Sequence, residues 1–147
     1  MTSSDLWTVR PMRDGDRSFV THSWITNYKA NSFLGNQTKK GFEEGMLPFV
    51  EQALDEDGCM VACAKEASEV ILAYLCYRVP NVVHFAYTKS GFRRNGIQRS
   101  LFESAGLKEG DPINASHYNH TARRLQERFP WLGFNHFEFY RMPKRVP

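Results

Sequence analysis

The segment from Val82 to Ala105 constrains the fold most, because it combines the signals of a strand, a loop and a helix in immediate succession. Its first part is rich in β-branched and aromatic residues, as a buried strand requires: Val82, Val83, Phe85 and Tyr87. A polar stretch from Lys89 to Asn95 then interrupts this pattern. After Gly96, apolar residues recur at helical spacing. The sequence therefore predicts a strand that leads directly into a helix N-terminus.

The predicted turn before this helix is basic. A helix N-terminus carries unpaired backbone N–H groups and a partial positive charge, which together suit a phosphate group. Four full positive charges surround it, at Lys89, Arg93, Arg94 and Arg99. Gly96 would let the backbone come close to such a ligand. The alternative is a basic loop that only faces solvent, and the R-x-x-G spacing alone does not distinguish the two.

Composition bounds the class of protein. The 147 residues are enough for one domain, residues 1–147, with a single core, and no repeat or linker divides them. The net charge of +3 permits an anionic ligand without demanding nucleic acid. The cysteines fall in predicted strands and are expected to be buried free thiols: Cys59, Cys63 and Cys76. We further expect a cytoplasmic protein, monomeric or homodimeric, with no metal site and no membrane contact.

The remaining segments complete a pattern of strands and helices. Strands are predicted at Leu6–Arg10, Cys59–Ala64, Val70–Val79, Ile113–Tyr118 and Phe134–Tyr140. Helices are predicted after a cap at Asp14 or Asp16, over Thr38–Asp55, where Pro48 marks a kink or a break, and over Asn119–Phe129. The short polar turn at Lys65–Glu69 favours antiparallel pairing. The order β α α β β β α β α β predicts an α/β (mixed α+β) fold, with a mostly antiparallel mixed sheet and helices on both faces.

This order, with its R-x-x-G turn, resembles the GNAT superfamily of N-acetyltransferases. The acyl-CoA motif of that family is Q/R-x-x-G-x-G/A, and Arg93 and Gly96 match its first residue and its central glycine. Gln98 stands where the family has a small residue. Because Gln is larger, its side chain must point away from the phosphates or shift the bound cofactor.

A second family motif follows the fifth predicted strand. It is matched by Asn119, Ala122, Leu125 and the pair Gly133–Phe134. Two departures stand out: Gln126 replaces the Tyr that often acts as the catalytic acid, and residues 130–132 look inserted. The resemblance covers nearly the whole chain.

The resemblance implies acetyl-CoA, or another acyl-CoA, bound along the fourth strand with its pyrophosphate on the N–H groups of residues 94–98. The expected cofactor-binding residues are Tyr87, Thr88, Arg93, Arg94, Asn95, Gly96, Ile97, Gln98 and Asn119. The expected acceptor is an amine of a small molecule or a protein. Trp24 and Tyr28, with Phe33, are expected to line its site, although the apolar spacing of Trp24 with Val20 also fits a core residue.

An amine must be neutral to attack a thioester, and His84 is the candidate base. The alternative is a histidine with a structural role within the sheet. Strict alternation places His84, Ala86 and Thr88 on one face of the strand. The opposite face, which should pack on a helix, then carries Val83, Phe85 and Tyr87. Tyr118 or Tyr87 is the candidate general acid.

Two other functions compete with this interpretation. Some GNAT-like phage proteins modify nucleic-acid bases, and arginines at 123, 124 and 128 and basic residues at 141, 144 and 145 are placed to track phosphates. A solvated helix face with a basic tail is the commoner explanation, so nucleic acid is not favoured. A catalytically degenerate CoA-binding module is the third hypothesis, because Gln98 and Gln126 both depart from the family pattern.

Overall fold

A computed structural model describes residues 6–31, 39–79, 81–93, 95–107, 113–115 and 132–134 of the chain. The described strands form one sheet in sequence order: β1 (Trp7–Pro11), β2 (Gly58–Ala64), β3 (Ala67–Arg78), β4 (Val82–Thr88), β5 (Ile113–Ala115) and β6 (Leu132–Phe134). The described α-helices are α1 (Arg17–Asn31), α2 (Lys39–Glu56) and α3 (Ile97–Ala105). Short 3₁₀ turns over Asp14–Asp16 and Ser90–Phe92 precede α1 and α3. The predicted helix at Asn119–Phe129 lies outside the described residues.

The sheet is mixed and mostly antiparallel, as predicted. β1 to β4 pair antiparallel in succession, whereas β4 pairs with β5, and β5 with β6, in parallel. A turn at Lys65–Glu66 joins β2 to β3, and Ala64 pairs with Ala67 beside it. Such a short connection permits only antiparallel neighbours. The parallel pairing of β4 and β5 is reached through α3, which lies between them in the sequence.

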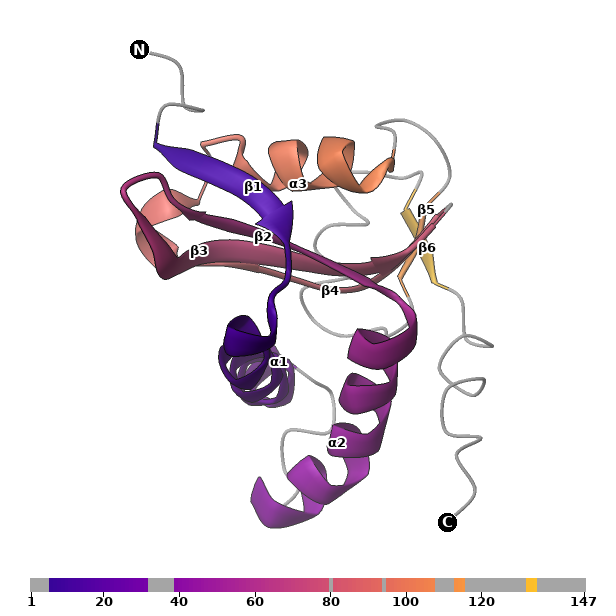
Figure 1. The fold of residues 1–147 in the computed structure, drawn as a ribbon. Helices are drawn as coiled ribbons and strands as arrows, with labels where there is room; N and C mark the ends of the chain where they lie inside the picture. Colours follow the sequence, from indigo (N-terminus) through magenta and orange to yellow (C-terminus); the bar gives the residue numbers. More distant parts are fainter. Residues whose placement is uncertain are drawn as a thin grey trace.

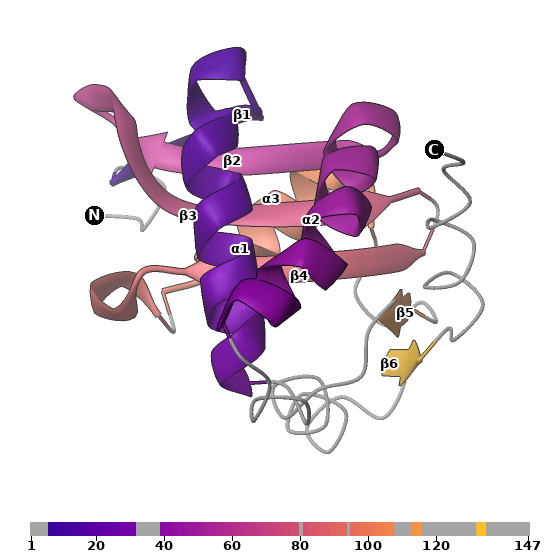
Figure 2. The same cartoon turned by 90° about the horizontal axis from the view of Figure 1, so that it is seen from below.

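Helices cover both faces of the sheet (Figures 1 and 2). α1 and α2 lie against one face, called here the α1/α2 face, and α3 lies against the other, called the α3 face. Each face has its own buried cluster. The α1/α2 face is led by Val20, Trp24, Phe49, Leu54, Val61 and Tyr74. The α3 face is led by Trp7, Leu72, Leu75, Ile97, Leu101 and Leu107. The predicted fold class is confirmed.

A β-bulge in β4 corrects the predicted side-chain alternation. Cys76 pairs with Phe85 and the next residue of β3, Tyr77, pairs with Val83, so His84 is an extra residue on β4. An extra residue shifts the alternation by one position. His84 therefore lies on the α1/α2 face, where its ring stacks on the ring of Trp24. Trp24 also stacks on Phe85, which belongs to the same face. Val83 lies on the α3 face instead. The prediction that placed His84 opposite Phe85 was wrong for this reason.

Two further differences concern α2 and the last strand. α2 continues through Pro48 as one helix, and its neighbours Met46 and Phe49 are buried in the α1/α2 cluster. Packing of that face holds the helix together across the proline, so the break that Pro48 suggests does not occur. The last described strand begins at Leu132, two residues before the predicted start at Phe134, and residues 135–140 lie outside the described residues.

The entry into α1 is fixed by an ion pair that the capping prediction did not include. Both Asp16 oxygens accept hydrogen bonds from the guanidinium of Arg10 on β1. Asp16 also accepts the backbone N–H of Arg13 at 2.8 Å, and Arg10 donates to the Ser68 carbonyl at 2.9 Å. The Arg10 guanidinium holds the pKa of Asp16 below its usual value, and the same bond raises the pKa of Arg10. The pair links β1, the start of α1 and the start of β3.

Candidate functional site

The turn between β4 and α3 has the predicted form. β4 ends at Thr88, and the N–H of Lys89 donates a hydrogen bond of 2.8 Å to the Leu72 carbonyl. α3 begins at Ile97, and its first helical bond is donated by Ser100 to the Gly96 carbonyl at 3.1 Å. The N–H groups of residues 97–99 precede that bond, so the helix itself does not use them. They form a set of donors at the positive end of the helix dipole.

Gly96 is required by its backbone conformation. It caps α3 with φ +80° and ψ 9°, in the left-handed region that costs an L-residue roughly 1–2 kcal/mol. A β-carbon built on it would meet none of the described residues within 4 Å. Crowding within the protein is therefore not the reason for glycine here. The open space beside the turn leaves its backbone accessible to a ligand.

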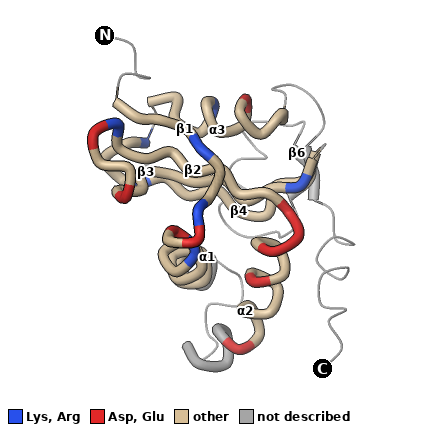
Figure 3. The backbone as a smooth tube through the Cα atoms, in the orientation of Figure 1, with Lys and Arg blue, Asp and Glu red and all other residues tan. Residues whose placement is uncertain are grey.

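Positive charge gathers at this turn. Lys89, Arg93 and Arg99 are exposed, and Arg93 donates from Nε to the Thr88 carbonyl at 3.4 Å. Arg94 lies outside the described residues. Acidic segments instead follow α2 (Figure 3), where Glu44, Asp55 and Glu56 are exposed. The described charges thus favour an anion at the α3 turn rather than along α2.

Gln98 points toward the sheet. Its side-chain amide donates to the Tyr87 carbonyl at 2.8 Å, to Thr88 Oγ1 at 3.1 Å and to the Tyr74 carbonyl at 3.3 Å. These acceptors lie on β3 and β4, so the side chain runs from α3 back to the strands. The effect of this large residue on the position of a bound cofactor stays a prediction.

His84 lies beside a carboxylate that sequence reasoning missed. Its Nε2 is 2.7 Å from Asp57 Oδ2, and the two side chains are 0% and 5% exposed. The imidazole ring is also stacked on Trp24 and meets the edge of Phe49. A carboxylate in this position orients the ring and selects which nitrogen carries the proton. In the sequence, Asp57 belongs to an acidic run at the end of α2, which resembles an ordinary solvated helix end.

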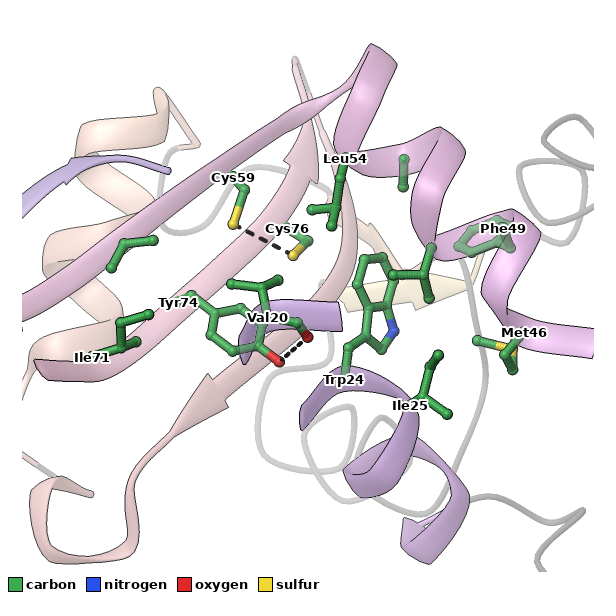
Figure 4. Close-up of a cluster of buried hydrophobic side chains, with 13 residues drawn as sticks. Val20, Trp24, Ile25, Met46, Phe49, Leu54, Cys59, Ile71, Tyr74 and Cys76 are labelled. Carbon is green, nitrogen blue, oxygen red and sulfur yellow. Dashed lines mark hydrogen bonds between the residues drawn. The ribbon is translucent and has the colours of Figure 1, made fainter. Parts of the chain in front are cut away.

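The aromatic side chains of Trp24, Phe49 and Tyr74 lie in the buried cluster of the α1/α2 face (Figure 4). Trp24 stacks on Phe85 with ring centroids 5.7 Å apart, and Tyr74 stacks on Tyr87 at 5.2 Å. Trp24 is 0% exposed, so the structure places it in the core, the second of its two predicted locations. The side chain of Tyr28 lies outside the described residues.

Burial keeps the Tyr74 hydroxyl and the Cys76 thiol of this core in their neutral forms. The Tyr74 hydroxyl is 2.7 Å from Ser23 Oγ and donates to the Val20 carbonyl at 3.2 Å, and burial raises the pKa of Tyr74. Cys76 donates to the Cys59 sulfur at 3.7 Å, and burial likewise raises the pKa of the Cys76 thiol. All three cysteines are buried and free, as predicted.

The structure therefore brings most of the predicted cofactor residues to one place, the end of β4 and the start of α3. They are Tyr87, Thr88, Arg93, Asn95, Gly96, Ile97 and Gln98. The predicted residues Tyr118 and Asn119 lie outside the described residues. Ile97 is buried in the α3 face, so its contribution to a ligand is its backbone N–H.

A surface groove of about 560 Å³ lies elsewhere, at α1 and α2. Its lining residues are Asp14, Arg17, Ser18, Thr21, His22, Ile25 and Leu47. None of the predicted site residues whose side chains the structure describes lines it. Within the described ranges, no group of three or more His, Cys, Asp or Glu is arranged to hold a metal ion. No described helix combines the length and hydropathy that crossing a membrane requires.

Comparison with known proteins gives structural likeness without sequence likeness. No family model matches the sequence, and no curated protein matches it. A GCN5-related N-acetyltransferase from Rhodopseudomonas palustris aligns with a TM-score of 0.56 and 12% identity, over 84% of this chain and 80% of its own. A protein from Corynebacterium glutamicum, described as histone acetyltransferase HPA2 and related acetyltransferase, aligns with a TM-score of 0.51 and 16% identity, over 84% and 83%.

A third solved structure, apo-form YjaB from Escherichia coli, aligns with a TM-score of 0.49 and 15% identity. The alignment covers 68% of this chain and 64% of YjaB. The likeness to the first two structures shows that the chain has the GNAT fold, as its sequence resemblance implied.

Proposed function

We propose that this chain, which has the fold of the GCN5-related N-acetyltransferases, is an acyl-CoA-dependent N-acyltransferase. The reaction would move an acetyl group from acetyl-CoA to an amine of a small molecule or a protein. The observation that carries the proposal is the turn at Gly96, where a left-handed glycine opens α3 at the end of the connection from β4. A fold alone does not define an activity, but this turn supplies a chemical reason for an anionic cofactor.

The turn would hold the pyrophosphate of the cofactor. Three N–H groups at residues 97–99 would donate to its oxygens, and each charge-assisted bond contributes about 1.5–3 kcal/mol. Lys89, Arg93 and Arg99 would add positive charge beside them. Bound acetyl-CoA would supply the acyl group as a thioester.

His84 is the proposed base, and Asp57 would orient it. The bulge places His84 on the α1/α2 face, so the residue lies across the sheet from α3. An acceptor amine must lose a proton, and a free lysine amine with a pKa of about 10.4 holds it tightly at pH 7. Because the imidazole is fully buried, the proton would reach it through a water or a neighbouring side chain. The competing role is structural: the pair connects the end of α2 to β4 across the face.

The proposal is tested by following CoA release with a thiol reagent while the protein is incubated with acetyl-CoA and a panel of primary amines and lysine peptides. We expect release above the rate without protein for at least one acceptor. Mass spectrometry of the gently purified protein should show a bound CoA species. Binding without turnover would identify a CoA-binding module, and the absence of both would contradict the cofactor assignment.

His84→Gln separates the two roles of the histidine. If His84 is the base, the variant loses about a hundredfold in kcat/KM and keeps its affinity for acetyl-CoA. Asp57→Asn should then lower the rate by a smaller factor and change its dependence on pH. A folded His84→Gln protein with an unchanged rate would assign the pair to structure.

A further inference from the structure

We infer that Gln98 is a positioning residue that fixes the Thr88 hydroxyl as a hydrogen-bond donor directed at the cofactor. The inference rests on the proposed function and concerns a residue that departs from the acyl-CoA motif. It starts from the three acceptors of the Gln98 amide, on Tyr74, Tyr87 and Thr88.

The direction of these bonds follows from chemistry. An amide oxygen cannot face two backbone carbonyls at 2.8 and 3.3 Å without repulsion, so the NH₂ group must be the one turned to Tyr87 and Tyr74. The NH₂ nitrogen offers two hydrogens and accepts none, so the two shorter bonds, to the Tyr87 carbonyl and Thr88 Oγ1, take one hydrogen each and the Tyr74 carbonyl shares one of them. Its contact with Thr88 Oγ1 at 3.1 Å therefore makes that hydroxyl an acceptor. The hydroxyl hydrogen remains for another partner.

The arrangement depends on the way the strands present their side chains. Tyr74 and Tyr87 are cross-strand partners, and both rings lie on the α1/α2 face. On the α3 face the backbone of this pair is not covered by its own side chains. Ala73 belongs to the α3 face and is paired with Thr88, which places the Thr88 side chain there as well. The Gln98 amide occupies the space beside Thr88.

A second observation indicates that Gln98 has more than a packing role. Its Oε1 atom is buried and has no hydrogen-bond partner among the described residues. A small residue at position 98 would avoid this unpaired acceptor. The cost of this unpaired oxygen is offset if the NH₂ group of Gln98 orients the Thr88 hydroxyl for the cofactor.

Thr88 is well placed for the proposed ligand. It is the last residue of β4, half-buried, and Arg93 donates to its carbonyl at 3.4 Å. Because Lys89 N–H bonds to Leu72 on β3, the N–H of Thr88 points to the opposite edge of β4. That is the edge on which β5 pairs. A donor hydroxyl at this position would bind an oxygen of the cofactor where the strand meets the turn.

A double-mutant cycle tests the inference, with acetyl-CoA affinity measured by isothermal titration calorimetry. The proteins are the parent, Gln98→Ala, Thr88→Val and the double variant. We expect each single variant to bind about fivefold or more weakly, and the double variant to be about as weak as the weaker single one. Thr88→Ser, which keeps the hydroxyl, should restore most of the affinity lost in Thr88→Val.

The outcomes separate this inference from the proposed function. If the parent does not bind acetyl-CoA, the proposed function fails first. If the parent binds but the two substitutions are additive, or Gln98→Ala binds as tightly as the parent, the positioning role is overturned. Far-ultraviolet circular dichroism confirms that each variant is folded, so a loss of binding is not mistaken for a loss of structure.

Discussion

The two faces of the sheet differ in the kinds of side chain that they bury. The α3 face packs mainly aliphatic and small side chains, such as Leu72 and Leu75, although the ring of Trp7 is also buried there. Polar contacts on this face lie at the start of α3, where Gln98 meets the strands. The α1/α2 face contains stacked aromatic rings and buried polar pairs. It also contains the thiols of Cys59 and Cys76, which point toward one another (Figure 4). The buried polar pairs are Ser23 with Tyr74, and Asp57 with His84.

This difference in side-chain composition indicates a separate role for each face of the sheet. Hydrophobic burial accounts for most of the α3 face, and the hydrogen bonds of Gln98 add polar contacts at the start of the helix. Buried polar groups are costly unless they are paired, so a face that contains several of them is specified by more than packing. The α3 face therefore supports the helix and its turn, and the residues of the proposed proton transfer lie on the α1/α2 face.

The largest expected effect is on the α3 face. Leu101 is fully buried there. Leu101→Ala removes apolar contacts and leaves a cavity, so it should lower the free energy of unfolding by about 2–5 kcal/mol. Urea denaturation measures this loss, and it should hardly vary with pH. Glu103→Ala, an exposed position on the same helix, is the control and should change stability little. A small effect at Leu101 would show that the face is loosely packed.

A smaller loss of stability, which depends on pH in the acid range, is expected when the ion pair between Arg10 and Asp16 is removed. Asp16→Asn removes a carboxylate whose pKa is lowered by Arg10, and should cost about 2 kcal/mol at pH 7. A lowered pKa stabilises the folded state above the unfolded pKa of about 3.9. The difference between parent and variant should therefore shrink as pH falls below 4 through the folded pKa of Asp16. A difference that stayed constant down to pH 2 would contradict the ion-pair account.

The smallest effect is expected at Tyr74. Tyr74→Phe removes the hydroxyl that meets Ser23 and Val20, and should cost about 1 kcal/mol near neutral pH. Burial raises the pKa of Tyr74, so its proton stabilises the folded state below the unfolded pKa of about 10 and this contribution is lost above it. Above pH 10 the free energy of unfolding of the parent should therefore fall relative to that of the Tyr74→Phe variant, and the difference between the two should shrink. Chemical denaturation at pH 7 and pH 10.5 compares the two.

Local signals in the sequence predicted most of the fold. The helix at Ile97–Ala105 was located by apolar spacing and by its glycine, and the strand at β2 by its run of small apolar residues. β3 begins at Ala67, three residues before the predicted Val70. Its exposed first residues lack the apolar character of a strand, and only the tight turn to β2 brings them into the sheet.

The parts of the site that the sequence did not show all depend on distant contacts. The bulge at His84 arises from pairing between β3 and β4, which single-strand alternation does not encode. Asp57 and His84 are 27 residues apart, and an acid at a helix end gives no local sign of its partner. Gln98 was recognised as unusual for the motif, but its three acceptors become visible only when α3 packs on the strands.

The central claim, that the β4–α3 turn binds an acyl-CoA, is tested most directly by two matched glycine variants. Gly96 and Gly106 flank α3 with nearly equal backbone angles, φ +80° and +84°, and a β-carbon at either meets no described residue within 4 Å. Replacing either glycine with Asp should therefore carry a similar backbone cost, whereas the helix dipole favours the aspartate at position 96 and disfavours it at position 106. Only Gly96 lies at the proposed phosphate site, where the aspartate would add bulk and negative charge.

Calorimetric titration measures the affinity for acetyl-CoA of the parent, Gly96→Asp and Gly106→Asp. The account predicts that Gly96→Asp weakens binding by about tenfold or more, while Gly106→Asp binds like the parent. Equal affinities in all three folded proteins, or an equal loss in both variants, would contradict it.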